Sequence, residues 1–169
     1  HAAYSARGDL KKLKNKSAVS DATKISVAVV GATGAVGEAL LSVLVERNFP
    51  VEKLLAVAKC NKSDDDTALF NERPVRVESI EDFDFSRCQI AFFCAPNAIA
   101  KKYAPRAVKS GCWVIDVSGQ FRLAADVPLM VPEINADCLK TLSGPQIVAS
   151  PDANVIQACS ALFPLQPQF

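Results

Sequence analysis

An apolar run that stops at a glycine and continues as a helical pattern is the feature that most constrains the fold of this chain. It reads VAVVGATGAVGEALL over residues 27–41. The β-branched run before Gly31 predicts a buried parallel strand, and the leucines and valines that follow recur at helical spacing. Gly31, Gly34 and Gly37 lie at G-x-x-G-x-x-G spacing between the two. A glycine loop that ends a strand and opens a helix indicates dinucleotide binding.

Each glycine of this loop has its own physical purpose. Gly31 permits the tight turn, Gly34 lets a pyrophosphate approach the backbone, and Gly37 allows the helix to pack closely on the strand. The N-terminus of the helix adds free amides and a favourable dipole for the phosphate charge. The alternative is a glycine-rich turn that binds no ligand.

Strand-like and helix-like patterns alternate along most of the chain. Further strands are expected at residues 53–59, 74–80, 88–95, 112–116, 129–135 and 146–150, and further helices at residues 97–111 and 154–163. Such alternation requires crossover connections. It predicts an α/β fold, Rossmann-like and doubly wound, with a mainly parallel sheet and helices on both faces. Pro105 is expected to kink its helix and Gly111 to cap it. Ligands of such folds bind at the carboxyl ends of the strands.

The residues after the second strand bear on the choice between NAD and NADP. No acidic residue directly follows that strand; Lys59 lies there, with Lys62 close by. A cation suits the 2′-phosphate of NADP, whereas an acidic residue suits the free ribose of NAD. Residues 64–66 are all aspartates and weaken this argument. NADP is the predicted cofactor and NAD the alternative, and an ordinary surface lysine is the alternative for Lys59.

Composition excludes several other classes of protein. Residues 1–20 carry a net charge of +4 and the whole chain +1, which leaves −3 for the remainder and no general basic surface for nucleic acid. The longest apolar runs are far too short to span a bilayer. Six cysteines without a C-x-x-C pair, and a single histidine, predict no metal site and no thioredoxin-like site. We therefore expect a reduced, cytoplasmic protein.

The leading segment and the rest of the chain are predicted to differ in organisation. Residues 1–23 lack the apolar core of a signal peptide and are interpreted as a tag or a disordered extension, with a processed transit peptide as the alternative. Residues 24–169 are predicted to form the dinucleotide-binding domain.

Three separate motifs follow one another in this domain. They are VAVVGATGAVGEALLSVLVERNFPVEKLLAVA, AKKYAPRAVKSGCWVIDVSGQFRLAADVPLMVPEIN and IVASPDANVIQ. Together they resemble the first half of the bacterial aspartate-semialdehyde dehydrogenases; N-acetyl-glutamyl-phosphate reductases share the glycine loop but match the second motif less well. The resemblance implies NADP binding and interconversion of aspartyl phosphate and aspartate semialdehyde through a cysteine thiolate. It also implies a homodimer, built largely by a C-terminal dimerisation and catalytic domain that we expect to be absent from this chain.

The resemblance also assigns roles to individual residues. The cofactor-binding positions are then Gly31, Thr33, Gly34, Ala35, Val36 and Gly37. Lys59 falls where the family often has an arginine for the 2′-phosphate. Arg122 matches the arginine that binds the substrate phosphate, and Gln157 matches a substrate-contacting glutamine. A surface ion pair is the alternative for Arg122, and an ordinary helix-surface residue is the alternative for Gln157.

The nucleophile that this family uses is missing. Where the family has Asn-Cys-Ser/Thr, the chain reads Asp152-Ala153-Asn154, so no catalytic residue is predicted. Cys159 lies six residues further along the helix, about 9 Å away, and does not easily replace the thiol. The family's histidine belongs to its second half. A Usg-type relative also lacks the cysteine, so NADP binding without catalysis is the predicted function. The alternatives are an oxidoreductase with altered chemistry and an interaction module whose cofactor loop is vestigial.

Overall fold

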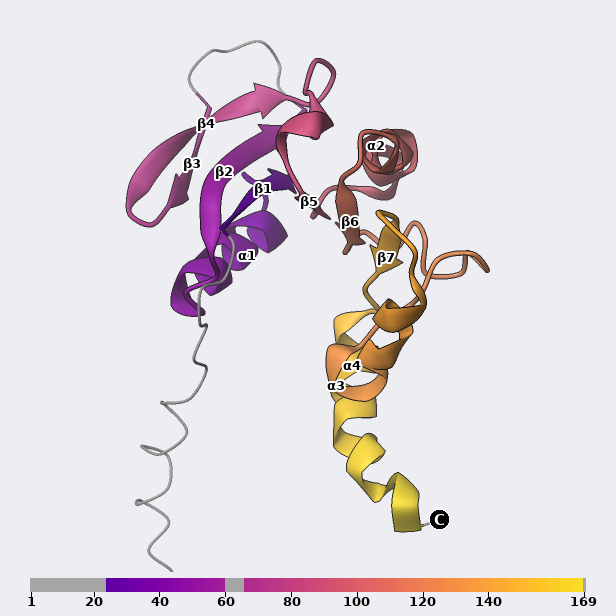
Figure 1. Ribbon diagram of the computed structural model, residues 1–169. Coiled ribbons are helices and arrows are strands. Elements are labelled where there is room, and N and C mark those ends of the chain that lie inside the picture. The colour runs from indigo at the N-terminus through magenta and orange to yellow at the C-terminus, as the bar shows by residue number, and fades with distance from the viewer. Residues whose placement is uncertain (1–23, 60–65, 169) are drawn as a thin grey trace, which may run out of the picture.

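A seven-stranded sheet organises the computed structural model, which describes residues 24–59 and 66–168 (Figure 1). The strands are β1 (Ile25–Val30), β2 (Val51–Ala58), β3 (Thr67–Phe70), β4 (Arg73–Ser79), β5 (Ile90–Phe93), β6 (Trp113–Asp116) and β7 (Ile147–Ala149). The α-helices are α1 (Ala35–Glu46), α2 (Asn97–Lys109), α3 (Pro132–Asn135) and α4 (Ala153–Leu162). Three 3-10 helices complete the fold: η1 (Phe85–Arg87), η2 (Ala136–Thr141) and η3 (Phe163–Gln168).

The strand order is β3-β4-β2-β1-β5-β6-β7, and every neighbouring pair is parallel except β3 and β4. From β1 the chain moves outward through β2 to β4. It then returns to the other side of β1 as β5 and continues outward through β6 to β7. The order therefore reverses between β1 and β5, which is where open α/β sheets bind their ligands. This architecture confirms the predicted Rossmann-like, doubly wound fold.

Two apolar layers form the core, one on each face of the sheet. Alternate residues of β1 supply both layers, because successive side chains of a strand point to opposite faces. Val27 and Val29 pack with Leu41 and Leu44 of α1 in one layer. The other layer packs residues of the central strands, Phe93 of β5 among them, against α2 and against Phe83 and Phe85. Its members include Ala28, Val30, Phe83, Phe85, Phe93, Ala100 and Tyr103. Helices α1 and α2 thus cover opposite faces, as predicted.

One strand prediction was wrong, and one strand was not predicted. Residues 129–135 were expected to form a strand, but only Leu129 makes an isolated parallel bridge, to Ala149, and α3 follows at once. Pro132 has no amide hydrogen and its fixed φ suits the first turn of a helix, which explains the outcome. The sequence prediction also missed β3. It is a four-residue edge strand joined to β4 by Asn71 and Glu72, whose φ angles are +50° and +62°.

The end of α2 agrees with the prediction for Gly111. This residue has φ +84°, and its amide donates to the carbonyl of Val108 while the amide of Cys112 donates to Ala107. A glycine in the left-handed region just after a helix is the usual way to satisfy its last carbonyls. Pro105 lies inside the helix, which extends to Lys109.

The part of the chain after β7 extends away from the sheet (Figure 1). None of the residues of α4 is buried. Within residues 24–59 and 66–168, no helix has both the length and the apolar character needed to cross a membrane. The leading segment of residues 1–23, and most of the polar loop after Lys59, lie outside the described residues.

Candidate functional site

The glycine loop connects the end of β1 to the start of α1. Gly31 has φ +88°, a conformation that favours glycine, and its amide donates to the carbonyl of Val57 at 2.7 Å. The amide of Gly34 then donates back to the carbonyl of Gly31 at 3.1 Å. These bonds fold residues 31–34 into a tight turn at the carboxyl end of the central strand.

Two of the three glycines are required by close packing. A Cβ atom added to Gly31 would lie 2.6 Å from the carbonyl oxygen of Cys94, in the segment after β5. One added to Gly37 would lie 2.1 Å from the carbonyl oxygen of Gly31. A Cβ atom on Gly34 would meet nothing closer than 3.5 Å, and the residue is exposed. Packing therefore leaves the Gly34 position open on its solvent side, where a ligand has room to approach.

The start of α1 presents backbone amides to this open space. Gly34 is the N-cap residue, no side chain caps the helix there, and the first helical bond runs from the Glu38 amide to the Gly34 carbonyl. The amides before Glu38 therefore have no acceptor within the helix. Thr33, Ala35 and Val36 are exposed around them. Free amides and the positive end of the helix dipole suit a pyrophosphate group.

The carboxyl ends of β2 and β4 place a cation beside an acid. Lys59 directly follows β2 and is exposed. The Ser79 hydroxyl, at the end of β4, donates to the Glu81 carboxylate at 2.7 Å. That hydrogen bond, and to a smaller degree the charges of Lys59 and Lys102, hold the pKa of the Glu81 carboxyl below its usual value. Lys59 thus has an acidic neighbour, Glu81, which was not predicted from the sequence.

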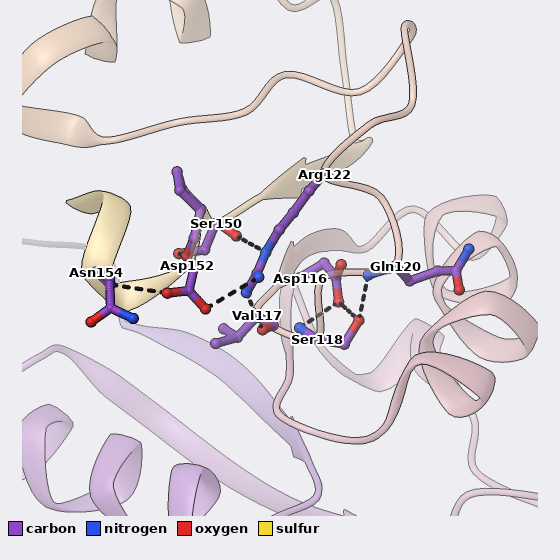
Figure 2. Close-up of polar contacts among 9 residues, drawn as sticks. Asp116, Val117, Ser118, Gln120, Arg122, Ser150, Asp152 and Asn154 are labelled. Carbon is purple, nitrogen blue, oxygen red and sulfur yellow. Dashed lines mark hydrogen bonds and ion pairs between the residues drawn. The ribbon is translucent and has the colours of Figure 1, made fainter. Parts of the chain in front are cut away.

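Arg122 ties the loop after β6 to the turn after β7 (Figure 2). Its Nε donates to the carbonyl of Ser150 at 2.9 Å, and its Nη2 donates to the carbonyl of Val117 at 3.2 Å. Its Nη1 lies 3.6 Å from Oδ2 of Asp152. The guanidinium therefore bridges two segments that are almost thirty residues apart in the sequence.

Asp116, the last residue of β6, shapes the loop that carries Arg122. Its side chain is fully buried, and its Oδ1 accepts hydrogen bonds from the amide of Ser118 at 3.1 Å and from its hydroxyl at 2.6 Å (Figure 2). The Ser118 hydroxyl oxygen in turn accepts from the amide of Gln120 at 3.1 Å. The other oxygen of Asp116, Oδ2, is buried without a partner among the described residues. Sequence reasoning missed this residue, although an aspartate that ends an apolar strand was the available signal.

Cys94 is the cysteine that follows β5, next to this carboxylate. Burial, and then the negative charge of Asp116, raise the pKa of its thiol to about 11. A thiol with such a pKa is protonated at neutral pH, and the thiolate is the nucleophilic form. Cys94 is therefore a poor candidate for a nucleophile despite its position.

The turn after β7 begins α4 without a reactive group. Asp152 is the N-cap residue, and its Oδ1 accepts a hydrogen bond from the amide of Asn154 at 3.0 Å. Ala153 is the first helical residue and is exposed. Gln157 is exposed one turn later, and Cys159 is half-buried on the same helix. The start of α4 at Ala153 agrees with the helix predicted from about residue 154.

The topology brings these groups to one edge of the sheet. The glycine loop, Lys59, the loop that begins at Asp116 and the Asp152 turn lie at the ends of β1, β2, β6 and β7, which all run in the same direction. Their carboxyl ends therefore meet at the same edge, which is the ligand-binding edge of open α/β sheets. No group of three or more histidine, cysteine or acidic side chains that could hold a metal ion occurs in the described parts of the chain.

Comparison of the sequence with models of known protein families identifies the family of this chain. The sequence model of the semialdehyde dehydrogenase NAD-binding domain matches residues 26–142, well over half of the chain. The chain belongs to the semialdehyde dehydrogenase family. It contains a nicotinamide dinucleotide-binding domain of that family.

Named relatives of this semialdehyde dehydrogenase domain are about twice as long. Aspartate-semialdehyde dehydrogenase of Shewanella violacea is 41% identical over 146 residues, which are 86% of this chain and 43% of the relative. Aspartate-semialdehyde dehydrogenase 2 of Vibrio cholerae is 42% identical over 142 residues, 84% of this chain and 42% of the relative. The chain thus spans less than half the length of these curated relatives.

Solved structures agree with this assignment to the semialdehyde dehydrogenases. The crystal structure of Vibrio cholerae aspartate-semialdehyde dehydrogenase II complexed with ASA has a TM-score of 0.79 at 42% identity, over 85% of this chain and 46% of that chain. The crystal structure of aspartate semialdehyde dehydrogenase with NADP from Candida albicans has a TM-score of 0.69 at 20% identity, over 87% of this chain and 48% of that chain. At that lower identity the similarity shows a shared fold.

Proposed function

We propose that this chain binds NADP(H) through the glycine loop and does not carry out the thiolate chemistry that the family resemblance implies. Ala153 carries this proposal, because it is the exposed first residue of α4 and has no nucleophilic atom. Covalent catalysis at an acyl group needs a nucleophile with an activating base beside it. The residue before Ala153 is instead Asp152, whose negative charge would raise the pKa of a thiol placed at position 153.

Neither Cys94 nor Cys159 readily replaces the missing thiol. The Cys94 thiol has its pKa raised to about 11 by burial and by Asp116. Cys159 lies six residues beyond Ala153 on the same helix, about 9 Å further along its axis. The one histidine of the chain is His1, which lies outside the described residues. The cofactor itself would supply hydride transfer, and this chain's residues would hold it.

The preference for NADP over NAD rests on Lys59. Lys59 directly follows β2, where a cation suits a 2′-phosphate, and no acidic residue takes its position, which supports the preference for NADP. Glu81 balances part of this charge, since Lys59 contributes to lowering the pKa of that carboxyl. We therefore expect NADP to be preferred and NAD to remain a weaker ligand. Thr33, Ala35 and Val36 would surround the pyrophosphate.

The family resemblance extends this proposal to a Usg-type, cytoplasmic protein that dimerises through a second half. Cys88, Cys94, Cys112, Cys138 and Cys159 are free thiols, as is usual in a reducing compartment. The absence of any buried residue in α4 leaves that helix available for a second half to cover. In such a protein the dinucleotide site would act in binding or regulation.

A turnover assay tests the proposal. The chain is mixed with NADP, aspartate semialdehyde and phosphate, and the absorbance at 340 nm is followed beside a thermal-stability titration with the cofactor. We expect NADP to raise the melting temperature and the absorbance to stay at the protein-free rate. Steady NADPH formation that is lost in Arg122→Ala would overturn the proposal in favour of an active oxidoreductase. No stabilisation at millimolar NADP or NAD would favour an interaction module.

A further inference from the structure

The guanidinium of Arg122 is already occupied by partners from its own chain. A guanidinium binds a phosphate or carboxylate best with two parallel N–H donors. In this structure Nε donates to Ser150, Nη2 donates to Val117, and Nη1 faces the carboxylate of Asp152 (Figure 2). Each of the three nitrogens therefore has an internal partner, and a ligand anion would have only the remaining N–H groups of Nη1 and Nη2, beside the carboxylate of Asp152.

Packing fixes the guanidinium in this arrangement. A Cβ atom added to Gly119 would lie 3.2 Å from Cζ of Arg122, so the guanidinium lies directly against the bare backbone of that glycine. Gly119 has φ +97°, a conformation that glycine adopts most readily. The Arg122 side chain is only 28% exposed. The arginine thus behaves as a brace between two loops rather than as a side chain free to reorient.

Asp152 is positioned to repel an incoming anion. Its Oδ1 is held by the Asn154 amide, which leaves Oδ2 directed at Nη1 of Arg122 at 3.6 Å. The Asp152 side chain is 52% exposed, so its charge reaches the space in front of the arginine. A phosphate that approached Arg122 would meet this like charge at close range.

We propose that Asp152 is an internal counter-ion of Arg122, and that the start of α4 therefore excludes phosphates and carboxylates from this arginine. The inference concerns the same turn as the proposed function and rests on it, since it names the ligand class that the altered turn rejects. It also accounts for two features together. The family's asparagine is an aspartate in this chain, and the arginine keeps its place although the nucleophile is gone.

Inorganic phosphate is the probe that tests this proposal. The melting temperature of the 169-residue chain is measured against phosphate at constant ionic strength, for the wild type, Arg122→Gln, Asp152→Asn and the double variant. Asparagine is as good an N-cap residue as aspartate, so Asp152→Asn retains the start of α4. Asp126→Asn is the matched control, because it removes one exposed carboxylate from the segment after Arg122 without touching the arginine.

The proposal predicts a response that appears only when the counter-ion is removed. The melting temperature of Arg122→Gln should respond to phosphate as that of the wild type does. If Arg122 of the wild type binds no phosphate, any response of the wild type comes from phosphate at the start of α1. Asp152→Asn should bind phosphate at least about tenfold more tightly than the wild type. The double variant should lose that gain, and Asp126→Asn should not show it.

Three results would overturn the proposal. The first is a phosphate response of the wild type that Arg122→Gln abolishes. The second is an Asp152→Asn variant that binds phosphate no better than the wild type. The third is a gain in phosphate affinity that persists in the double variant. If Asp152→Asn fails to fold, the phosphate responses of the wild type and Arg122→Gln still test the proposal. Equal responses support it, and a wild-type response that Arg122→Gln abolishes overturns it. NADP binding is measured separately, so a failure of the proposed function is distinguishable from a failure of this inference.

Discussion

Replacing Gly37 by alanine should damage the fold far more than its small size suggests. The new methyl carbon would lie 2.1 Å from the carbonyl oxygen of Gly31, whereas close carbon–oxygen contacts lie at roughly 3.3 Å. The carbonyl carbon of Gly31 and the Cα atom of Ala32 would each be only 2.9 Å away. All three atoms belong to the backbone of the turn, so no side-chain rotation relieves the clash. Either α1 or the loop must move by about 1 Å.

The magnitude follows from these distances. Overpacking a tight core site costs typically about 1–3 kcal/mol, and a backbone-to-backbone clash belongs at the upper end. The better helix propensity of alanine returns up to about 1 kcal/mol. We therefore expect a net loss of about 2–3 kcal/mol in the free energy of unfolding. That is a large share of the roughly 5–15 kcal/mol that stabilises a typical domain.

Two other glycines provide matched controls. Gly34→Ala has no contact closer than 3.5 Å and keeps an ordinary φ of −93°, so its stability should change by less than about 1 kcal/mol. Gly111→Ala meets no atom within 4 Å but must keep φ +84°, which costs about 1 kcal/mol through backbone strain alone. The three variants therefore separate steric clash from backbone strain.

Urea unfolding measures the three variants. Trp113, the one tryptophan of the chain, is half-buried in β6 and reports on unfolding through its fluorescence. A Gly37→Ala midpoint equal to that of Gly34→Ala, with an unchanged slope, would refute the close approach of α1 to the glycine turn.

Further predictions concern the charges around the site. Lys59→Glu should reverse the preference for NADP over NAD, measured as the ratio of the two dissociation constants, and an unchanged ratio would remove Lys59 from the proposal. A thiol introduced by Ala153→Cys should be alkylated faster when Asp152→Asn is also present, because the aspartate raises the thiol pKa; equal rates would argue against that effect. The native Cys94 thiol should be alkylated appreciably only as pH rises toward about 11, because burial and then Asp116 raise its pKa from 9.0. A rate that levels off near pH 9 would contradict that assignment.

Local sequence patterns predicted most of the fold, and they failed where tertiary contacts decide. The apolar β-branched runs at β1 and β5 and the glycine after α2 are local signals, so they were predicted well. The run at residues 129–135 also begins with three apolar residues, but Pro132 favours the start of a short helix and only Leu129 pairs with the sheet edge. The edge strand β3 has only four residues, too short to give a clear alternation.

The candidate site divides in the same way. The strand–loop–helix geometry of the glycine loop and the lack of a nucleophilic atom at Ala153 were predictable, because each depends on neighbouring residues in the sequence. The contact between Arg122 and Asp152 joins residues thirty positions apart and depends on β6 and β7 lying side by side. The role of Asp116 depends on its burial. Neither long-range pairing nor burial can be assigned from spacing alone.

A fluorescence titration with NADPH tests the central claim most directly. The chain is titrated with NADPH, and Gly34→Ala is titrated beside it, because that variant keeps the fold and places a methyl group where the pyrophosphate would approach. We predict saturable binding by the wild type and an affinity at least about tenfold lower for Gly34→Ala, equivalent to about 1.4 kcal/mol. Equal affinities, or no saturation by the wild type at millimolar NADPH, would contradict the claim that this glycine loop holds the cofactor.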